Sequence, residues 1–119
     1  MEKYLYKLES ALAVAISDHV EKTKTIIIQH SYEVVIDHVS SVHPVVKSDI
    51  KPHNLLSGDT IEVLVEGEVS LHQKVQNGTQ GRNITFWIRY AKVRFNHETE
   101  SFQVLDVSQF LPLGFKTGI

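Results

Sequence analysis

NITFWIRYAKVRF, residues 83–95, is the stretch that decides the fold of this chain. Its apolar residues alternate with polar ones, as in a β-strand that turns one face to a core. The alternation changes phase after Tyr90, and a strand of period two changes its core face only where one residue is inserted. We therefore predict a β-bulge at Tyr90-Ala91 in a long strand that curves at that point. The expected core residues are Ile84, Phe86, Ile88 and Tyr90 before the bulge and Ala91, Val93 and Phe95 after it.

The preceding segment, residues 59–76, has the same alternation and predicts the strand that pairs with this stretch. NGTQGR, residues 77–82, is rich in residues that adopt turns and predicts the connection. Placing Gln76 opposite Asn83 sets apolar residues against one another on the core face, so we expect this register. It pairs Leu71 with Ile88, Val69 with Tyr90 and His72 with Trp87 before the bulge, and Glu68 with Lys92 and Glu66 with Arg94 after it.

The first third of the chain predicts a helix and one further element. Residues 2–21 carry apolar side chains at helical spacing, which is typical of an amphipathic helix packed on a sheet. Residues 24–39 are rich in β-branched residues and alternate, which favours a strand, although the same residues also suit a helix face. The apolar stripe of the helix consists of Leu5, Leu8, Leu12, Ala15, Ile16 and His19.

Breakers and turn residues mark the other connections. Residues 40–58 contain Pro44, Pro52 and Gly58, and they predict a long loop. Such a long loop in a small domain is often functional. After the decisive stretch we expect a turn at residues 97–100, a last strand at 102–110 with Phe102 opposite Phe95 and Val104 opposite Val93, and a tail at 111–119.

These elements predict one α+β domain over residues 1–119, in which the N-terminal helix packs on a curved antiparallel sheet of about four strands. The element order and the strand curvature resemble the cystatin-like or nuclear-transport-factor-2-like architecture. Residues 73–78, QKVQNG, are faintly similar to the Q-x-V-x-G hairpin of cystatins. Asn77 stands where that motif has its glycine, so the resemblance implies a fold and no protease inhibition.

Composition narrows the classes of function. Twelve Lys and Arg against fourteen Asp and Glu give a net charge of −2, which does not favour a nucleic-acid-binding domain. Cysteine is absent, which excludes disulfides and thiolate metal sites and fits a reducing compartment. The charged start MEKYLYKLES is untypical of a secretory signal, and no apolar run approaches the roughly 18 residues of a membrane span. We therefore expect a cytoplasmic protein without membrane association.

The decisive stretch and its flank carry a basic and aromatic pattern of the kind that stacks single-stranded bases. In the expected register Glu66 and Glu68 lie beside the basic residues and neutralise them. Charge pairing on a solvated face is therefore the simpler interpretation, and nucleic acid is not expected as a partner. The residues of the pattern are Arg82, Trp87, Arg89, Lys92 and Arg94.

No catalytic motif stands out. The chain has no GxSxG, P-loop or Rossmann fingerprint. Asp18-His19 and Asp37-His38 repeat a pair that suits general base chemistry, but neighbouring side chains on a helix or strand do not face each other. Several histidines offer imidazole ligands without any HxH or HxxxH spacing, so we predict neither a metal nor a cofactor. These histidines are His30, His38, His43, His53 and His72.

Two functions remain open from the sequence. The first is a non-catalytic module that binds a protein partner or a second copy of itself, because apolar residues gather on the outer face of the predicted sheet. The second is a small enzyme or ligand-binding protein with a pocket between the helix and the concave sheet. The interface candidates are Leu64, His72, Trp87 and Leu105, and the pocket candidates are Tyr32, His38, Tyr90 and Asp106, with His30 beside them.

Overall fold

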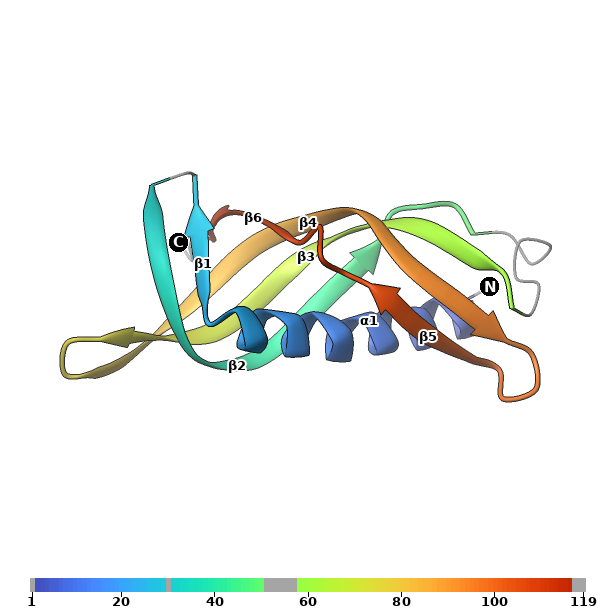
Figure 1. Cartoon of the computed structure of the whole chain (residues 1–119), viewed down its shortest axis with the longest axis horizontal. Coiled ribbons are helices and arrows are strands. Elements are labelled where there is room, and N and C mark those ends of the chain that lie inside the picture. Colours follow the sequence, from blue (N-terminus) through green and yellow to red (C-terminus); the bar gives the residue numbers. More distant parts are fainter. Residues whose placement is uncertain (1, 30, 51–57, 117–119) are drawn as a thin grey trace.

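The computed structural model describes residues 2–29, 31–50 and 58–116 and has an α+β arrangement. One N-terminal helix lies on the concave side of an open antiparallel sheet that arches over it (Figure 1). Within the described residues the sheet has six strands, where the sequence predicts about four. The elements are α1 (Glu2–Thr23), β1 (Thr25–Ile28), β2 (Tyr32–Val46), β3 (Thr60–Val75), β4 (Gly78–Asn96), β5 (Ser101–Asp106) and β6 (Leu111–Phe115).

Helix α1 is held to the sheet by one apolar stripe. Leu8, Leu12, Ile16 and Val20 recur every four residues and are fully buried. Burial of each such side chain contributes about 1.5–3 kcal/mol relative to its exposure to water. The expected stripe is confirmed in its centre, but it begins later and ends later than predicted, because Leu5 is 36% exposed and Val20 belongs to it.

The predicted bulge in β4 is confirmed, one residue earlier than expected. Ile88 pairs with Val65 and Ala91 pairs with Val63, so Arg89 and Tyr90 together stand opposite the single residue Leu64. Ile88 and Ala91 are both buried, which moves the core face from one parity to the other. Tyr90 is half exposed on the outer face, and the expectation that it faces the core is wrong.

The register predicted for the β3–β4 hairpin is wrong by six residues. The chain turns at Gln76-Asn77, so that Val75 pairs with Gly78, and most of residues 77–82 belong to strand β4. Trp87 therefore lies opposite Glu66, and His72 lies opposite Gly81. The sequence offered several turn-forming residues in a row, and the observed turn uses the first of them. The pairs on the outer face become Glu62–Lys92, Thr60–Arg94 and Glu68–Thr85.

Strand formation extends through much of the segment predicted as a loop. Within residues 24–39, the segments 25–28 and 32–39 form strands, as favoured. They pair with each other as the antiparallel strands β1 and β2, and β2 then continues to Val46. Pro44 lies within β2 opposite Gly67, where the two backbones come unusually close. Of the predicted loop at residues 40–58, the part at 51–57 lies outside the described residues.

Strands β5 and β6 share one edge of β4. Strand β5 pairs with the end of β4 as predicted, with Phe95 opposite Phe102 and Val93 opposite Val104. The expected strand at residues 102–110 ends at Asp106, and the chain then returns as β6 along the first half of β4. The prediction of a tail at residues 111–119 is wrong for Leu111–Phe115, which form β6.

Candidate interaction surface

The bulge in β4 gathers large side chains on the outer face of the sheet. Trp87 and Leu64 are partly exposed there, and Tyr90 beside them is half exposed. Together with Ser48, Glu62 and Arg89 they line a shallow groove of about 360 Å³. The insertion of one residue is the cause, because it turns both Arg89 and Tyr90 outward at the same level as Leu64.

Trp87 sits at the centre of this group. The guanidinium carbon of Arg89 lies 5.7 Å from the centroid of the Trp87 ring, within the range of a cation–π contact. Glu66 flanks Trp87 on strand β3, and Leu111 flanks it on strand β6. A tryptophan with an arginine against it and apolar neighbours has the composition of an interaction hot spot.

Strand β6 extends the exposed apolar surface beyond the predicted residues. Leu111 is 45% exposed and Leu113 is 42% exposed. Leu113 also lines a depression of about 330 Å³ with Val45 of β2, and both leucines line a larger one with Ile27 of β1. We call the surface formed by Leu64, Trp87, Tyr90, Leu111 and Leu113 the outer patch. Its leucines were not predicted from the sequence because LPLGF contains a proline and a glycine, two residues that disfavour a strand.

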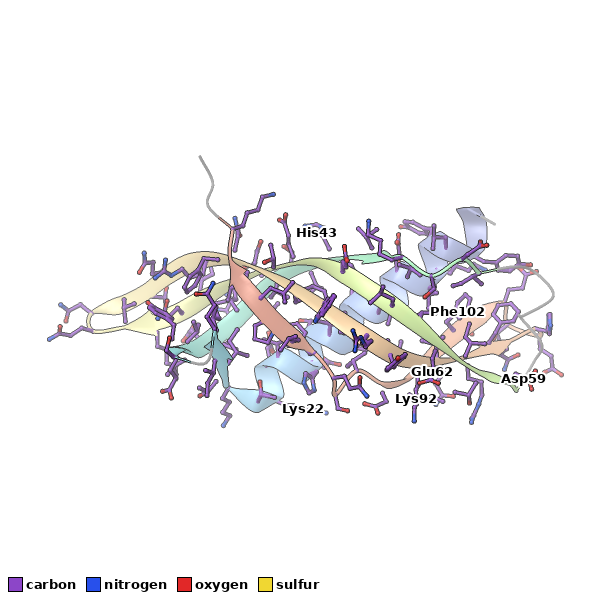
Figure 2. All side chains as sticks on the ribbon, turned by 90° about the horizontal axis from the view of Figure 1, so that it is seen from above. Lys22, His43, Asp59, Glu62, Lys92 and Phe102 are labelled. Carbon is purple, nitrogen blue, oxygen red and sulfur yellow. The ribbon has the colours of Figure 1, made fainter. Side chains whose placement is uncertain are left out.

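Two rows of opposite charge flank the outer patch on neighbouring strands. Strand β3 carries an acidic row and strand β4 carries a basic row, and Figure 2 shows Glu62 and Lys92 on this face. The pairs predicted for Glu66 and Glu68 are wrong, but the basic strand is still flanked by carboxylates, since Lys92 lies opposite Glu62 on one side and Asp106 on the other. The acidic row consists of Glu62, Glu66 and Glu68, and the basic row of Arg89, Lys92 and Arg94.

The interface candidates from the sequence are only partly brought together. Leu64 and Trp87 line the same groove. Leu105 is partly exposed on β5. His72 lies elsewhere on the sheet, because its ring stacks on His38 of β2 with the centroids 4.5 Å apart. The predicted pairing of His72 with Trp87 is therefore wrong.

The pocket candidates lie on different elements with different neighbours. The hydroxyl of Tyr32 accepts a hydrogen bond from Arg82 at 3.0 Å. Nδ1 of His38 is 2.8 Å from the carboxylate of Asp37, which precedes it on β2. Tyr90 is on the outer face, and Asp106 accepts a hydrogen bond from the backbone N–H of Ser108 at the end of β5. His30 lies outside the described residues.

Two carboxylates have shifted proton affinities. The hydrogen bond with the His38 imidazole holds the pKa of Asp37 below its usual value. Hydrogen bonds from the side chain and the backbone of Ser108 lower the pKa of Asp106 in the same direction. Both groups are near the surface, and their charged forms are the ones that the local structure favours.

A cavity of about 210 Å³ does lie between α1 and the sheet, at the N-terminal half of the helix. Much of its wall is formed by Tyr4 and Leu8 of the helix, Val46 of β2 and Phe102 of β5. None of the four predicted pocket residues lines this cavity. The rings of Tyr4 and Phe102 both pack on Phe95, with centroids 5.5 and 4.9 Å away, so this part of the wall is aromatic.

Within residues 2–29, 31–50 and 58–116, no three His, Asp or Glu side chains are placed to hold a metal ion. His53 lies outside this part of the chain. The helix of the described structure is not apolar enough to cross a membrane. Comparisons with protein-family models, with curated proteins and with solved structures find no match for this chain. The outer patch and the cavity therefore have to be interpreted from their own chemistry.

Proposed function

We propose that this protein is a non-catalytic interaction module that associates with a second copy of itself through the outer patch. The observation that carries the proposal is the bulge in β4, which sets Tyr90 and Trp87 side by side with Leu64 on the face of the sheet opposite helix α1 (Figure 1). Aromatic side chains and arginine are enriched in the cores of protein interfaces, where they contribute most of the binding energy. Leu111 and Leu113 enlarge the apolar area on the same face.

The helix followed by strands that wrap around it supports the cystatin-like or nuclear-transport-factor-2-like architecture as the finer fold of this module. The cysteine-free sequence supports a cytoplasmic location. Nucleic acid is not part of the proposal, because carboxylates flank Lys92 of β4 on both sides and an acidic row lies beside the basic row.

Light scattering over a concentration series tests this proposal. We expect the mass of the wild type to rise from that of one copy towards two, and Trp87→Glu to remain at one copy. Tyr90→Glu changes a half-exposed side chain and repeats the test with little effect on folding. Val14→Glu is the matched control, since Val14 is 65% exposed on α1, away from the outer patch. A wild type that stays monomeric, or a Tyr90→Glu variant that dimerises like the wild type, would contradict self-association.

The cavity beside α1 supports a second function, the binding of a small apolar ligand. Its volume of about 210 Å³ and its aromatic wall suit a single or fused aromatic ring. Indole titrated into the labelled protein should shift the amide signals of Leu8, Val46 and Phe102 in NMR spectra. Leu5→Trp, at the exposed mouth of the cavity, should abolish the shifts. Unchanged spectra at millimolar indole would remove this candidate.

A further inference from the structure

We infer that the two copies lie face to face about a two-fold axis parallel to the strands, so that β3 of each copy lies over β4 of the other. This inference rests on the self-association proposed above and specifies its geometry. Closed two-fold dimers bring the same surface of both copies together, so the surface must complement itself. The charges around the outer patch decide how this can happen.

The acidic and the basic row lie on adjacent strands, one on each side of the line between β3 and β4. Glu62 and Glu66 of β3 alternate with buried residues and point outward, as do Lys92 and Arg94 of β4. Because Glu62 is directly opposite Lys92 in the ladder, the two rows are also level along the strands. A two-fold axis that runs along the line between the strands therefore exchanges an acidic row for a basic row at the same height.

The alternative axis in the plane of contact is perpendicular to the strands. It would place β3 over β3 and β4 over β4, and so acidic residues over acidic residues and basic residues over basic ones. Like charges brought together in an interface are costly, whereas opposite charges favour and orient the encounter. The charge pattern thus selects the parallel axis.

The positions of the apolar residues also favour the parallel axis. Leu64 is level with Arg89 and Tyr90 across the ladder, so the parallel axis lays Leu64 of one copy over Tyr90 of the other, twice. Trp87 is level with Glu66, so its indole N–H meets a carboxylate across the interface. The contact then has an apolar centre with charged pairs around it, which is the usual anatomy of a protein interface.

A charge exchange tests the geometry. One variant carries Glu62→Lys and Glu66→Lys, so that both of its rows are basic. The other carries Arg89→Glu and Lys92→Glu, so that both of its rows are acidic. We expect each variant alone to dimerise at least about tenfold more weakly than the wild type, because like charges now face each other. An equimolar mixture should recover dimers close to the wild-type affinity, since both contacts in the mixed dimer join opposite charges.

The readout is native mass spectrometry, in which one isotope-labelled partner distinguishes the mixed dimer from both homodimers. Circular dichroism confirms folding, and the single changes Glu62→Lys and Lys92→Glu repeat the test if a double variant unfolds. A dimeric wild type whose variants each dimerise as tightly as it does, or form a mixed dimer tighter than the wild-type dimer, would overturn the geometry alone, because these are the results that the perpendicular axis gives. The absence of any mixed dimer would also overturn it. A monomeric wild type would overturn the self-association together with its geometry.

Discussion

At the scale of single residues, Gly67 allows strands β2 and β3 to approach each other unusually closely. A Cβ at this position would overlap the carbonyl oxygen of His43 and would lie 3.0 Å from Cα of Pro44, and both are backbone atoms that cannot turn aside. The absence of a side chain on Gly67 therefore allows the close approach of the two strands at Pro44.

We expect Gly67→Ala to lower the free energy of unfolding by about 1–3 kcal/mol, because the two strands must separate to admit the methyl group. Gly81→Ala is the matched control in the neighbouring hairpin strand, where the nearest heavy atom would be 3.9 Å away on the side chain of His72. Urea denaturation of both variants measures the difference. Equal midpoints for the two variants would contradict the close approach.

Arg82 ties three parts of the sheet together. Its Nε donates to the amide oxygen of Gln73 at 3.0 Å, and a terminal nitrogen donates to the hydroxyl of Tyr32. The guanidinium also lies over the ring of Phe115, 4.4 Å from its centroid. Gln73 is the one polar side chain among the buried described residues, so Arg82 satisfies the group that most needs a partner.

Arg82→Met should cost about 1–3 kcal/mol of stability, since it leaves the Gln73 amide oxygen unpaired in the core. In Gln73→Met/Arg82→Met the unpaired oxygen is absent, and the double variant should be less destabilised than the sum of the two single variants. A double-mutant cycle in urea measures this coupling. Strict additivity would show that the hydrogen bond between the two side chains contributes nothing.

Asp106 makes the stability of the fold slightly dependent on pH. Its pKa is lowered by the hydrogen bonds from Ser108, so its charged form is favoured in the folded state. For a carboxylate with a depressed pKa, the contribution to stability is complete above the unfolded pKa of about 4 and is lost as the pH falls through the folded pKa. Asp106→Asn should therefore lower the melting temperature at pH 7 and approach the wild type near pH 2. Parallel melting curves at all pH values would exclude this role.

At the scale of the elements, α1 supplies partners for the free edge of β2. Strand β1 covers only the first residues of β2, and beyond them the helix lies alongside. The carboxylate of Glu9 accepts the backbone N–H of Val46 at 2.8 Å, and that of Glu21 accepts the N–H of Val39 at 3.0 Å. Two helical glutamates thus replace the neighbouring strand that these amides lack.

We expect Glu9→Leu to be more destabilising than Glu21→Leu, because the bond to Val46 is partly buried and the bond to Val39 is exposed to water. The loss for Glu9→Leu should be about 1–3 kcal/mol. Glu9→Gln keeps an oxygen acceptor and should recover much of it. Hydrogen exchange of the Val46 amide checks the cause directly, since its protection should fall in the leucine variant and persist in the glutamine variant.

The helix and strands also show how much of the fold can be predicted from the sequence alone. Periodicity predicted α1, the α+β class and the bulge in β4, because each of these leaves a repeating pattern within one segment. It missed β6 because residues 111–115 owe their strand conformation to pairing with β4, far away in the sequence. The register failed for a similar reason, as more than one turn in residues 76–82 aligns apolar residues. The outer patch was therefore predicted at Leu64 and Trp87 but not at Leu111 and Leu113.

At the scale of the whole molecule, the long β3–β4 hairpin and the helix beneath it make an elongated body (Figure 1). Its extents are 50 × 23 × 23 Å, and its radius of gyration is 15.3 Å, above the roughly 13.5 Å expected for a compact chain of this length. Two copies of an elongated molecule make the most extensive contact when they lie side by side along their length. The outer patch and its charged rows lie along that side, which links the shape of the molecule to the proposed dimer.

Small-angle X-ray scattering separates the proposed dimer from an end-to-end one. Two copies side by side have centres about 23 Å apart, and the squared radius of gyration of a dimer is that of one copy plus the square of half the separation. The parallel dimer should therefore reach about 19 Å, whereas copies joined at their ends, about 50 Å apart, should reach about 29 Å. Measured at rising concentration, the wild type should move from the value of one copy towards the lower of these two, because contact along the rod is what the outer patch requires. Movement towards the higher value would place the contact at the hairpin tips and exclude the outer patch as the interface.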